Sequence, residues 1–191
     1  MKAALLILAG ALLPGCGAPP PRASGEDAGS APAVTQKQAD DDSGQGAVTL
    51  RVTDYDGVME LITGHKGKVV VMDCWSTSCE PCLREFPGLV KLHEKHGPEK
   101  VACVSLSFDY EGLESTEEIE PRVLEFLKKQ RATFDNLLSS EESDALSKKF
   151  KFGAIPAVFV YDQEGKLAKQ FINSVKYDEI GAFVEELLAG K

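Results

Sequence analysis

Two cysteines separated by two residues are the side chains of this sequence that point most directly to chemistry. Cys79-Glu80-Pro81-Cys82 follows an apolar run over residues 69–75 and opens a helical pattern. A Cys-x-x-Cys pair placed between a strand and a helix is typical of dithiol chemistry, in which two thiols exchange with a disulfide. Because the thiolate is the attacking species, the cysteine with the lower pKa is expected to react first.

Cys79 is expected to be that nucleophile, because it stands where the strand passes into the helix. Unpaired backbone N–H groups and the positive end of the helix dipole favour an anion there. Pro81 suits the first helical turn because it has no N–H group to leave unpaired. Cys82 lies one turn further on and is expected to resolve a mixed disulfide. The alternatives are half of a zinc site or an inert structural disulfide, but zinc would need two further ligands, and neither a second Cys-x-x-Cys nor a suitable His pair appears.

The elements around this motif predict an α/β fold with a mixed central β-sheet flanked by helices. Strands are predicted at residues 48–52, 69–75, 101–108, 134–138, 157–161 and 166–172. Helices are predicted at residues 54–62, 82–93 with a kink at Pro87, 117–130, 143–150 with a cap at Ser143, and 180–188. Residues 109–116 are expected to form a polar loop, and the last two strands a hairpin.

Composition excludes several classes of function. The formal net charge is −9, with 30 acidic and 21 basic residues, which argues against a nucleic-acid partner because such surfaces need a basic footprint. Five cysteines are too few for a disulfide-rich scaffold. No flavin or nicotinamide motif is present, so no cofactor is expected. Cys74 and Cys103 fall in predicted core strands and are expected to be inert buried thiols.

The N-terminus predicts export and a lipid anchor. Residues 1–15 have a short basic start and an apolar stretch that is too short to span a bilayer, as in a signal peptide. The stretch ends at Leu13-Pro14-Gly15-Cys16, which resembles the lipobox of bacterial lipoproteins and implies that Cys16 carries lipid. A plain secretory signal is the alternative. Residues 16–46 are predicted to be the lipidated cysteine and a disordered tether, and residues 47–191 to be the folded domain.

The segment from Asp73 to Cys82 resembles the active-site segment of the thioredoxin superfamily. It is most similar to the extracytoplasmic, membrane-tethered branch typified by TlpA and ResA. The residues that fill that branch's pattern are Trp75, Thr77, Cys79, Pro81, Cys82, Arg84, Glu85 and Pro87. Gly153-Ala154-Ile155-Pro156 resembles the loop whose proline is cis and faces the dithiol. The resemblance covers about residues 47–190 and implies a thioredoxin-like fold.

The resemblance also implies roles for residues around the dithiol. Pro156, preceded by Ile155, would be cis and would hold substrate backbone beside Cys79. Asp73 matches a buried acid that relays a proton to or from Cys82, although it could instead be a polar group that is merely satisfied. Glu85 matches a glutamate that tunes the dithiol, or else lies on a solvated helix face. Glu80 is expected to modulate the thiolate or to contact partners.

The function implied by this resemblance is thiol:disulfide exchange outside the cytoplasm. The substrates would be protein thiols and disulfides, with reduction as the expected direction and cytochrome c maturation as one task. Electrons would come from a membrane partner, because the sequence carries no redox cofactor motif. A thiol peroxidase of the same fold and a non-enzymatic envelope adaptor are the alternatives. The expected location is the bacterial cell envelope, with the lipid-anchored protein on the periplasmic side.

Overall fold

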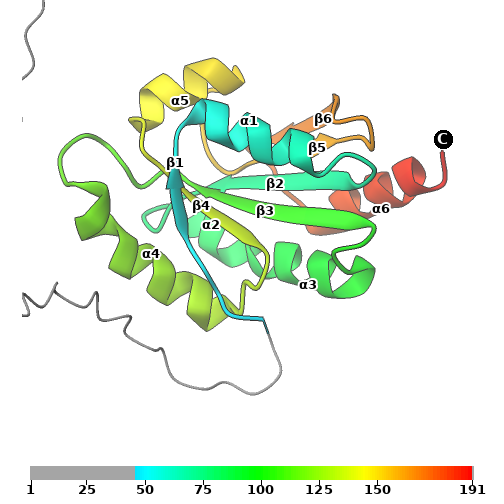
Figure 1. The fold of residues 1–191 in the computed structure, drawn as a ribbon, viewed down its shortest axis with the longest axis horizontal. Coiled ribbons are helices and arrows are strands. Elements are labelled where there is room, and N and C mark those ends of the chain that lie inside the picture. Colours follow the sequence, from blue (N-terminus) through cyan, green and yellow to red (C-terminus); the bar gives the residue numbers. More distant parts are fainter. Residues whose placement is uncertain (1–45, 191) are drawn as a thin grey trace, which may run out of the picture. The chain divides into compact units, whose positions relative to one another are not determined.

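A computed structural model describes residues 46–190 of the chain (Figure 1). Its elements are β1 (Arg51–Thr53), α1 (Tyr55–Gly64), β2 (Val69–Trp75), α2 (Glu80–Glu85), α3 (Pro87–His96), β3 (Val101–Ser107), α4 (Thr116–Gln130), β4 (Asp135–Ser139), α5 (Ser143–Phe150), β5 (Ala157–Tyr161), β6 (Leu167–Ile172) and α6 (Tyr177–Leu188). The predicted signal peptide, Cys16 and the predicted tether up to residue 45 lie outside the described residues. Between residues 46 and 190, no helix has the length and apolar character that a membrane span requires.

The strands form one mixed sheet in the order β1-β4-β3-β2-β5-β6. The first four of these run parallel, whereas β5 is antiparallel to β2 and forms a hairpin with β6. Every residue of β2 and β3 is buried, because helices cover both faces of the sheet. This burial explains why both strands are mostly apolar along their whole length, with Asp73 in β2 and Ser105 and Ser107 in β3 as the polar exceptions. Since β2 and β3 are parallel neighbours, their carboxyl ends meet at the same edge of the sheet.

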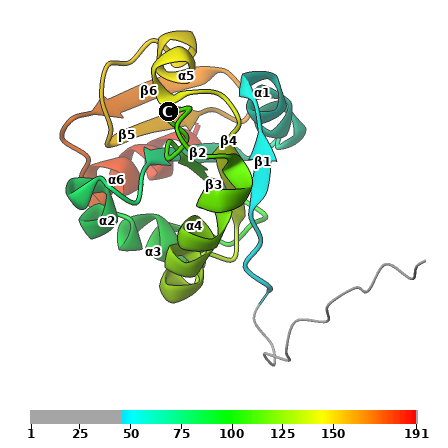
Figure 2. The same cartoon turned by 90° about the vertical axis from the view of Figure 1, so that its left-hand side faces the viewer.

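Helices lie in two layers on the two faces of the sheet (Figures 1 and 2). Helices α3, α4 and α6 cover one face through an apolar cluster that includes Leu89, Val123 and Ile180. Helices α1 and α5 cover the other face through Val58 and Leu146. The predicted α/β class, a mixed sheet flanked by helices, is therefore confirmed.

Side chains alternate between the two layers along β2. Val71 and Trp75 belong to the cluster under α3, α4 and α6, and Asp73 lies between them on the same face. Met72 and Cys74 belong to the opposite cluster. The acid of this strand therefore faces the layer that contains the Cys-x-x-Cys helix.

Three predicted elements have wrong bounds. The helix predicted at residues 180–188 begins earlier, at Tyr177. The strand predicted at residues 48–52 begins at Arg51, because only residues 51–53 pair with β4. The single kinked helix predicted after Cys82 is instead two helices, α2 and α3, which meet at Phe86. Pro87 is the first residue of α3, a position where its missing N–H leaves no helical hydrogen bond unmade.

The cap predicted at Ser143 is also wrong. Glu142 precedes the helix, and Ser143 is the first helical residue. The Ser143 hydroxyl donates instead to the backbone carbonyl of Phe108 at 2.7 Å and lies 3.2 Å from that of Tyr110. A long-range contact with the end of β3 has replaced the local capping bond, and it ties α5 to the edge of the sheet where the dithiol lies.

Candidate active site

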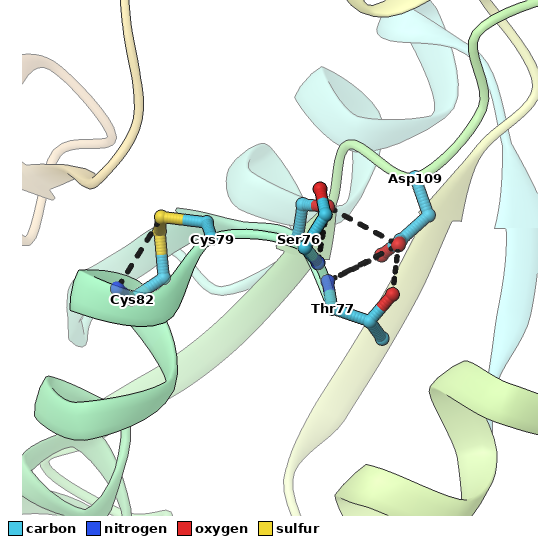
Figure 3. The surroundings of a disulfide bond; sticks show 6 residues. Ser76, Thr77, Cys79, Cys82 and Asp109 are labelled. Atoms are coloured by element: carbon cyan, nitrogen blue, oxygen red, sulfur yellow. Dashed lines mark hydrogen bonds between the residues drawn. A yellow bond between two sulfur atoms is a disulfide. The ribbon is translucent and has the colours of Figure 1, made fainter.

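The dithiol lies at the carboxyl edge of the sheet, where β2 is followed by α2. Strand β2 ends at Trp75, residues 76–78 form a connection, and Cys79 is the N-cap of α2. The backbone N–H of Cys82 donates to the Cys79 sulfur at 3.3 Å. Cys79 and Cys82 are joined by a disulfide with a Cα–Cα distance of 5.2 Å (Figure 3). An N–H group aimed at the Cys79 sulfur stabilises negative charge there once the bond is reduced.

The two sulfurs differ in their access to solvent. Cys79 is partly exposed, and it is preceded and followed by the exposed residues Ser78 and Glu80. Cys82 is 2 % exposed and belongs to the core cluster under α3, α4 and α6. An external disulfide can therefore reach Cys79, whereas Cys82 is accessible only to its neighbour. This asymmetry suits the predicted roles of nucleophile and resolving thiol.

Asp109 organises the connection that leads to Cys79. Its carboxylate accepts hydrogen bonds from the backbone N–H of Thr77 at 3.1 Å, from the Thr77 hydroxyl and from the Ser76 hydroxyl at 3.1 Å (Figure 3). The Ser107 hydroxyl donates to it at 2.6 Å. The pattern of the sequence places Asp109 in a polar loop, but the residue is 7 % exposed. The residue does lie in the predicted loop between β3 and α4, and it is buried because hydroxyl and amide donors surround its carboxylate.

Asp73 is a buried acid whose side chain has one hydrogen-bond partner within the part of the chain that the structure describes. It is 2 % exposed, and the Tyr177 hydroxyl of α6 donates to its Oδ2 atom at 2.5 Å. Its Oδ1 atom is buried without a hydrogen-bond partner among residues 46–190. Burial raises the pKa of Asp73 to about 7, the Tyr177 hydrogen bond opposes this rise, and the nearby Glu85 charge adds to it. Asp73 therefore changes its protonation near neutral pH, as a proton relay requires.

The predicted proline loop lies beside the dithiol. The Ile155-Pro156 peptide bond is cis, as the resemblance implies. The next residue, Ala157, pairs with Cys74 near the end of β2, which brings the loop to the edge of the sheet where Cys79 lies. Ser78 and Ile155 both line a pocket of about 150 Å³, and both Cys79 and Ile155 pack against the same core cluster. The two motifs, far apart in sequence, thus meet at one site.

The remaining predicted site residues lie on α2. Glu80 and Pro81 are exposed in its first turn, so both are available to a partner. Glu85 is partly exposed, and its carboxylate lies 3.7 Å from the Arg84 guanidinium. Because the Glu85 charge also acts on Asp73, Glu85 is close enough to influence the buried acid. Glu85 is thus a partly exposed group whose charge raises the pKa of the buried acid.

Cys74 and Cys103 are free, buried thiols on neighbouring strands. They belong to different core clusters and therefore point to opposite faces of the sheet, which excludes a bridge between them. Burial raises the pKa of both thiols, so they stay neutral. Among the described residues, no three metal-ligating side chains converge on one point.

Comparison with known proteins identifies the family. A family model described as AhpC/TSA family matches residues 32–170. The chain belongs to the AhpC/TSA family. Among curated relatives of this AhpC/TSA protein, thiol-disulfide oxidoreductase ResA of Bacillus anthracis is 24% identical over 144 residues, which cover 75% of this chain and 78% of the relative. Sporulation thiol-disulfide oxidoreductase A of Bacillus subtilis (strain 168) is 25% identical over 122 residues, 64% of this chain and 70% of the relative.

Solved structures resemble this AhpC/TSA protein in fold. A thiol-disulfide isomerase from Corynebacterium glutamicum superposes with a TM-score of 0.58 at 18% identity, covering 74% of this chain and 95% of that one. A thiol:disulfide interchange protein DsbE from Chlorobium tepidum superposes with a TM-score of 0.53 at 19% identity, covering 68% and 83%. The predicted resemblance to thioredoxin-like proteins of the ResA type is confirmed by these findings.

Two residues of the candidate active site, Asp109 and Tyr177, were not predicted from the sequence. Asp109 has a recognisable signal, because it follows a buried strand that neighbours the one leading to Cys79, and parallel strands end at the same edge. Tyr177 has none, because 104 residues separate it from Asp73. The last helix is predicted from the sequence only from residue 180, so Tyr177 lies outside the predicted helix although α6 begins there.

Proposed function

We propose that this thioredoxin-like thiol–disulfide oxidoreductase reduces protein disulfides outside the cytoplasm while a lipid on Cys16 holds it at a membrane. The observation that carries the disulfide-exchange chemistry of this proposal is the pairing of a partly exposed Cys79 with a 2 % exposed Cys82. A substrate can enter a mixed disulfide with the first sulfur, and only the second sulfur is placed to release it.

The exchange follows from the positions of the two sulfurs. The Cys79 thiolate attacks a substrate disulfide, forms a mixed disulfide with one substrate sulfur and expels the other as a thiolate. Cys82 then loses its proton and attacks the Cys79 sulfur. The Cys79–Cys82 disulfide forms and the second substrate thiolate leaves. The substrate has gained two electrons and the protein has lost them, so each turnover ends in the disulfide-bonded state.

Residues around the dithiol have proposed roles in this cycle. Pro156 holds substrate backbone beside Cys79, supported by the meeting of its loop with the Cys79 segment at one edge of the sheet. Asp73 takes the proton from Cys82, since it shares that side of the sheet and its pKa is raised to about 7. Glu85 adjusts the pKa of Asp73 through its charge, and the exposed Glu80 contacts partners.

Location and electron supply complete the proposal. The apolar N-terminus and the lipobox-like Leu13-Pro14-Gly15-Cys16 support export and lipidation. The oxidised protein then needs electrons from a membrane-bound thiol partner, because its sequence has no flavin or nicotinamide motif. Haem-site cysteines of apocytochrome c are one candidate substrate, in keeping with the resemblance to the TlpA and ResA branch.

A redox titration of the Cys79/Cys82 pair tests the direction of transfer. Related dithiols range from about −270 mV for reductants to about −120 mV for strong oxidants. We expect a potential in the reducing half of that range, and a value near the oxidant end would refute the reductase proposal.

A trapping experiment tests the enzymatic role itself. Cys82→Ala should accumulate mixed disulfides between Cys79 and exported proteins, because nothing remains to resolve them, and Cys79→Ala is the matched control that should trap none. Absence of trapped partners in intact cells would favour the adaptor alternative. Rapid consumption of hydroperoxide by the reduced wild type, without protein disulfide reduction, would favour the peroxidase alternative.

A further inference from the structure

The buried acid behind the dithiol is held by one tyrosine from the last helix of the fold. We propose that Tyr177 is a positioning residue for disulfide exchange, which holds the Asp73 carboxylate as proton acceptor for Cys82 and fits only because Gly88 lacks a side chain. The kinetic part of this inference rests on the proposed reductase function, whereas its effect on Asp73 itself does not.

The first observation is that the two carboxyl oxygens of Asp73 differ in their hydrogen bonding. Oδ2 receives the Tyr177 hydroxyl, and Oδ1 is buried with no hydrogen-bond partner among residues 46–190. A donated hydrogen bond favours the carboxylate over the neutral acid. The unpartnered oxygen is then the one free to accept a proton. Tyr177 therefore both orients the carboxyl group and keeps it in the form that can act as a base.

The second observation is how closely the Tyr177 ring approaches α3. A Cβ atom placed on Gly88 would lie 2.3 Å from Cγ, 2.4 Å from Cδ2 and 2.5 Å from Cβ of Tyr177. No side chain fits there without moving the tyrosine, because the clash includes its Cβ atom and not only the ring tip. Gly88 is the second residue of α3, directly after Pro87. The missing side chain at Gly88 thus lets Tyr177 pack directly against the backbone of α3.

The third observation is the groove outside this contact. A groove of about 590 Å³ runs between α3 and α6, with Gly88, Lys91, Lys176 and Tyr177 in its wall. Asp73 does not line it. The Tyr177 ring therefore lies between the groove and the buried acid, and it limits the hydration that would otherwise lower the pKa of Asp73.

Other titratable groups near Asp73 have different effects. Glu85 of α2 raises the pKa of Asp73 by its charge. Cys103 of β3 and the adjacent Cys74 also interact with Asp73, but burial raises their own pKa values well above neutral, so they carry no charge. The pKa of Tyr177 is raised as well, which keeps its hydroxyl protonated as a donor. When the dithiol is reduced, Cys82 adds a buried thiol to the core cluster on this side of the sheet, whereas Cys79 is partly exposed.

The proton balance of the resolving step defines what Tyr177 influences. The Cys82 thiol transfers its proton to the Asp73 carboxylate as the sulfur attacks Cys79. The Cys79–substrate S–S bond breaks, and its electron pair leaves with the substrate thiolate, which takes a proton from water. Asp73 then returns its proton to solvent. The step requires an ionised Asp73, so its rate depends on the fraction of molecules in which that group is a carboxylate.

Tyr177→Phe in the full-length chain tests the inference, because it removes the hydroxyl and keeps the ring. A carboxyl ¹³C titration of the oxidised protein should show the pKa of Asp73 rising by about 1 unit, as expected for the loss of one hydrogen bond to a charged group. Tyr55→Phe is the matched control, since the Tyr55 hydroxyl has no hydrogen-bond partner within residues 46–190 and should leave Asp73 unchanged. An unchanged or lowered pKa in Tyr177→Phe would overturn the inference.

A double-mutant comparison separates positioning from a merely structural role. Resolution of a mixed disulfide should be about five-fold slower at pH 7 in Tyr177→Phe, and should approach the wild-type rate near pH 9, where Asp73 ionises in both proteins. In an Asp73→Asn background, Tyr177→Phe should add no further loss. An equal loss in both backgrounds would contradict the inference. If no disulfide is reduced at all, the proposed function fails while the titration still decides the role of Tyr177.

Discussion

The backbone amide of Thr77 lies 3.1 Å from both carboxylate oxygens of Asp109. Asp109 therefore holds the backbone two residues before Cys79. The Thr77 and Ser76 hydroxyls donate to the same carboxylate. Because Asp109 lies just after the end of β3 and Thr77 just after the end of β2, these bonds tie together the ends of two neighbouring strands. The segment that presents the nucleophile is therefore fixed by the sheet in addition to the hydrogen bonds of its own turn, in which the Cys79 N–H donates to the Ser76 carbonyl at 3.1 Å.

Asp109→Ala should destabilise the protein and loosen Cys79. Loss of the carboxylate leaves buried amide and hydroxyl donors unpaired, and we expect the free energy of unfolding to fall by about 2 to 4 kcal/mol. Disulfide exchange should slow under conditions where the variant remains folded. Denaturant unfolding and exchange kinetics measure the two effects. Glu111→Ala changes an exposed acid two residues further on and should stay within about 0.5 kcal/mol. Similar losses in the two variants would contradict the role given to Asp109.

Asp73→Asn should stabilise the oxidised protein at high pH and much less at low pH. The folded-state pKa of Asp73 is about 7 against an ordinary value of 3.8. Between these values the folded state binds more protons than the unfolded state, so the contribution of Asp73 to stability falls as the pH rises through this window.

Above pH 7 the buried charge costs on the order of 4 kcal/mol, because the pKa of Asp73 lies about 3 units above its ordinary value and each unit corresponds to about 1.4 kcal/mol. Asparagine removes the charge and keeps an oxygen to accept from Tyr177. Urea unfolding at pH 4 and pH 8 measures the difference. A stabilisation that is equal at both pH values would show that Asp73 does not titrate in this window.

Gly88→Ala should destabilise the protein, although alanine normally favours a helix by up to about 1 kcal/mol over glycine. The new methyl group would lie within 2.5 Å of three Tyr177 atoms, and overpacking of this kind costs about 1 to 3 kcal/mol. Gly181→Ala in α6 is the matched control, because its methyl group would meet only Leu92, at 3.9 Å. We expect that variant to be neutral or slightly more stable in thermal unfolding. A neutral Gly88→Ala would mean that α3 and Tyr177 can separate without cost.

Cys16→Ser should release the protein from membranes. Acyl chains contribute about 0.8 kcal/mol per buried methylene, so their loss removes the proposed anchor. Fractionation of cells should move the variant into the soluble envelope fraction, while the Cys79/Cys82 potential stays unchanged in the purified protein. Retention of Cys16→Ser in the membrane fraction would refute the lipid anchor.

Local patterns in the sequence account for much of the fold. The apolar run of residues 69–75 is strand β2 with the predicted limits, and the heptapeptide around Val104 is the buried strand β3. The position of Cys79 at a helix start is predicted and observed. The cis bond at Pro156 is observed too, but it is implied by the family resemblance and not by a local pattern. The other features depend on neighbours in the chain, on hydrophobic periodicity and on motif spacing, which a sequence displays directly.

Contacts between distant segments decided what those patterns left open. Ser143 reads as a helix cap, yet its hydroxyl bonds to the carbonyl of Phe108. Asp109 reads as a loop residue, yet it is buried among donors from two strand ends. Asp73 could be recognised as a buried acid, but its partner Tyr177 lies 104 residues away on the last helix. The pKa of a group depends on its burial and on the groups that pack against it, so only the tertiary structure brings the pKa of Asp73 to near neutral. The dithiol, in contrast, can be identified from four consecutive residues of the sequence.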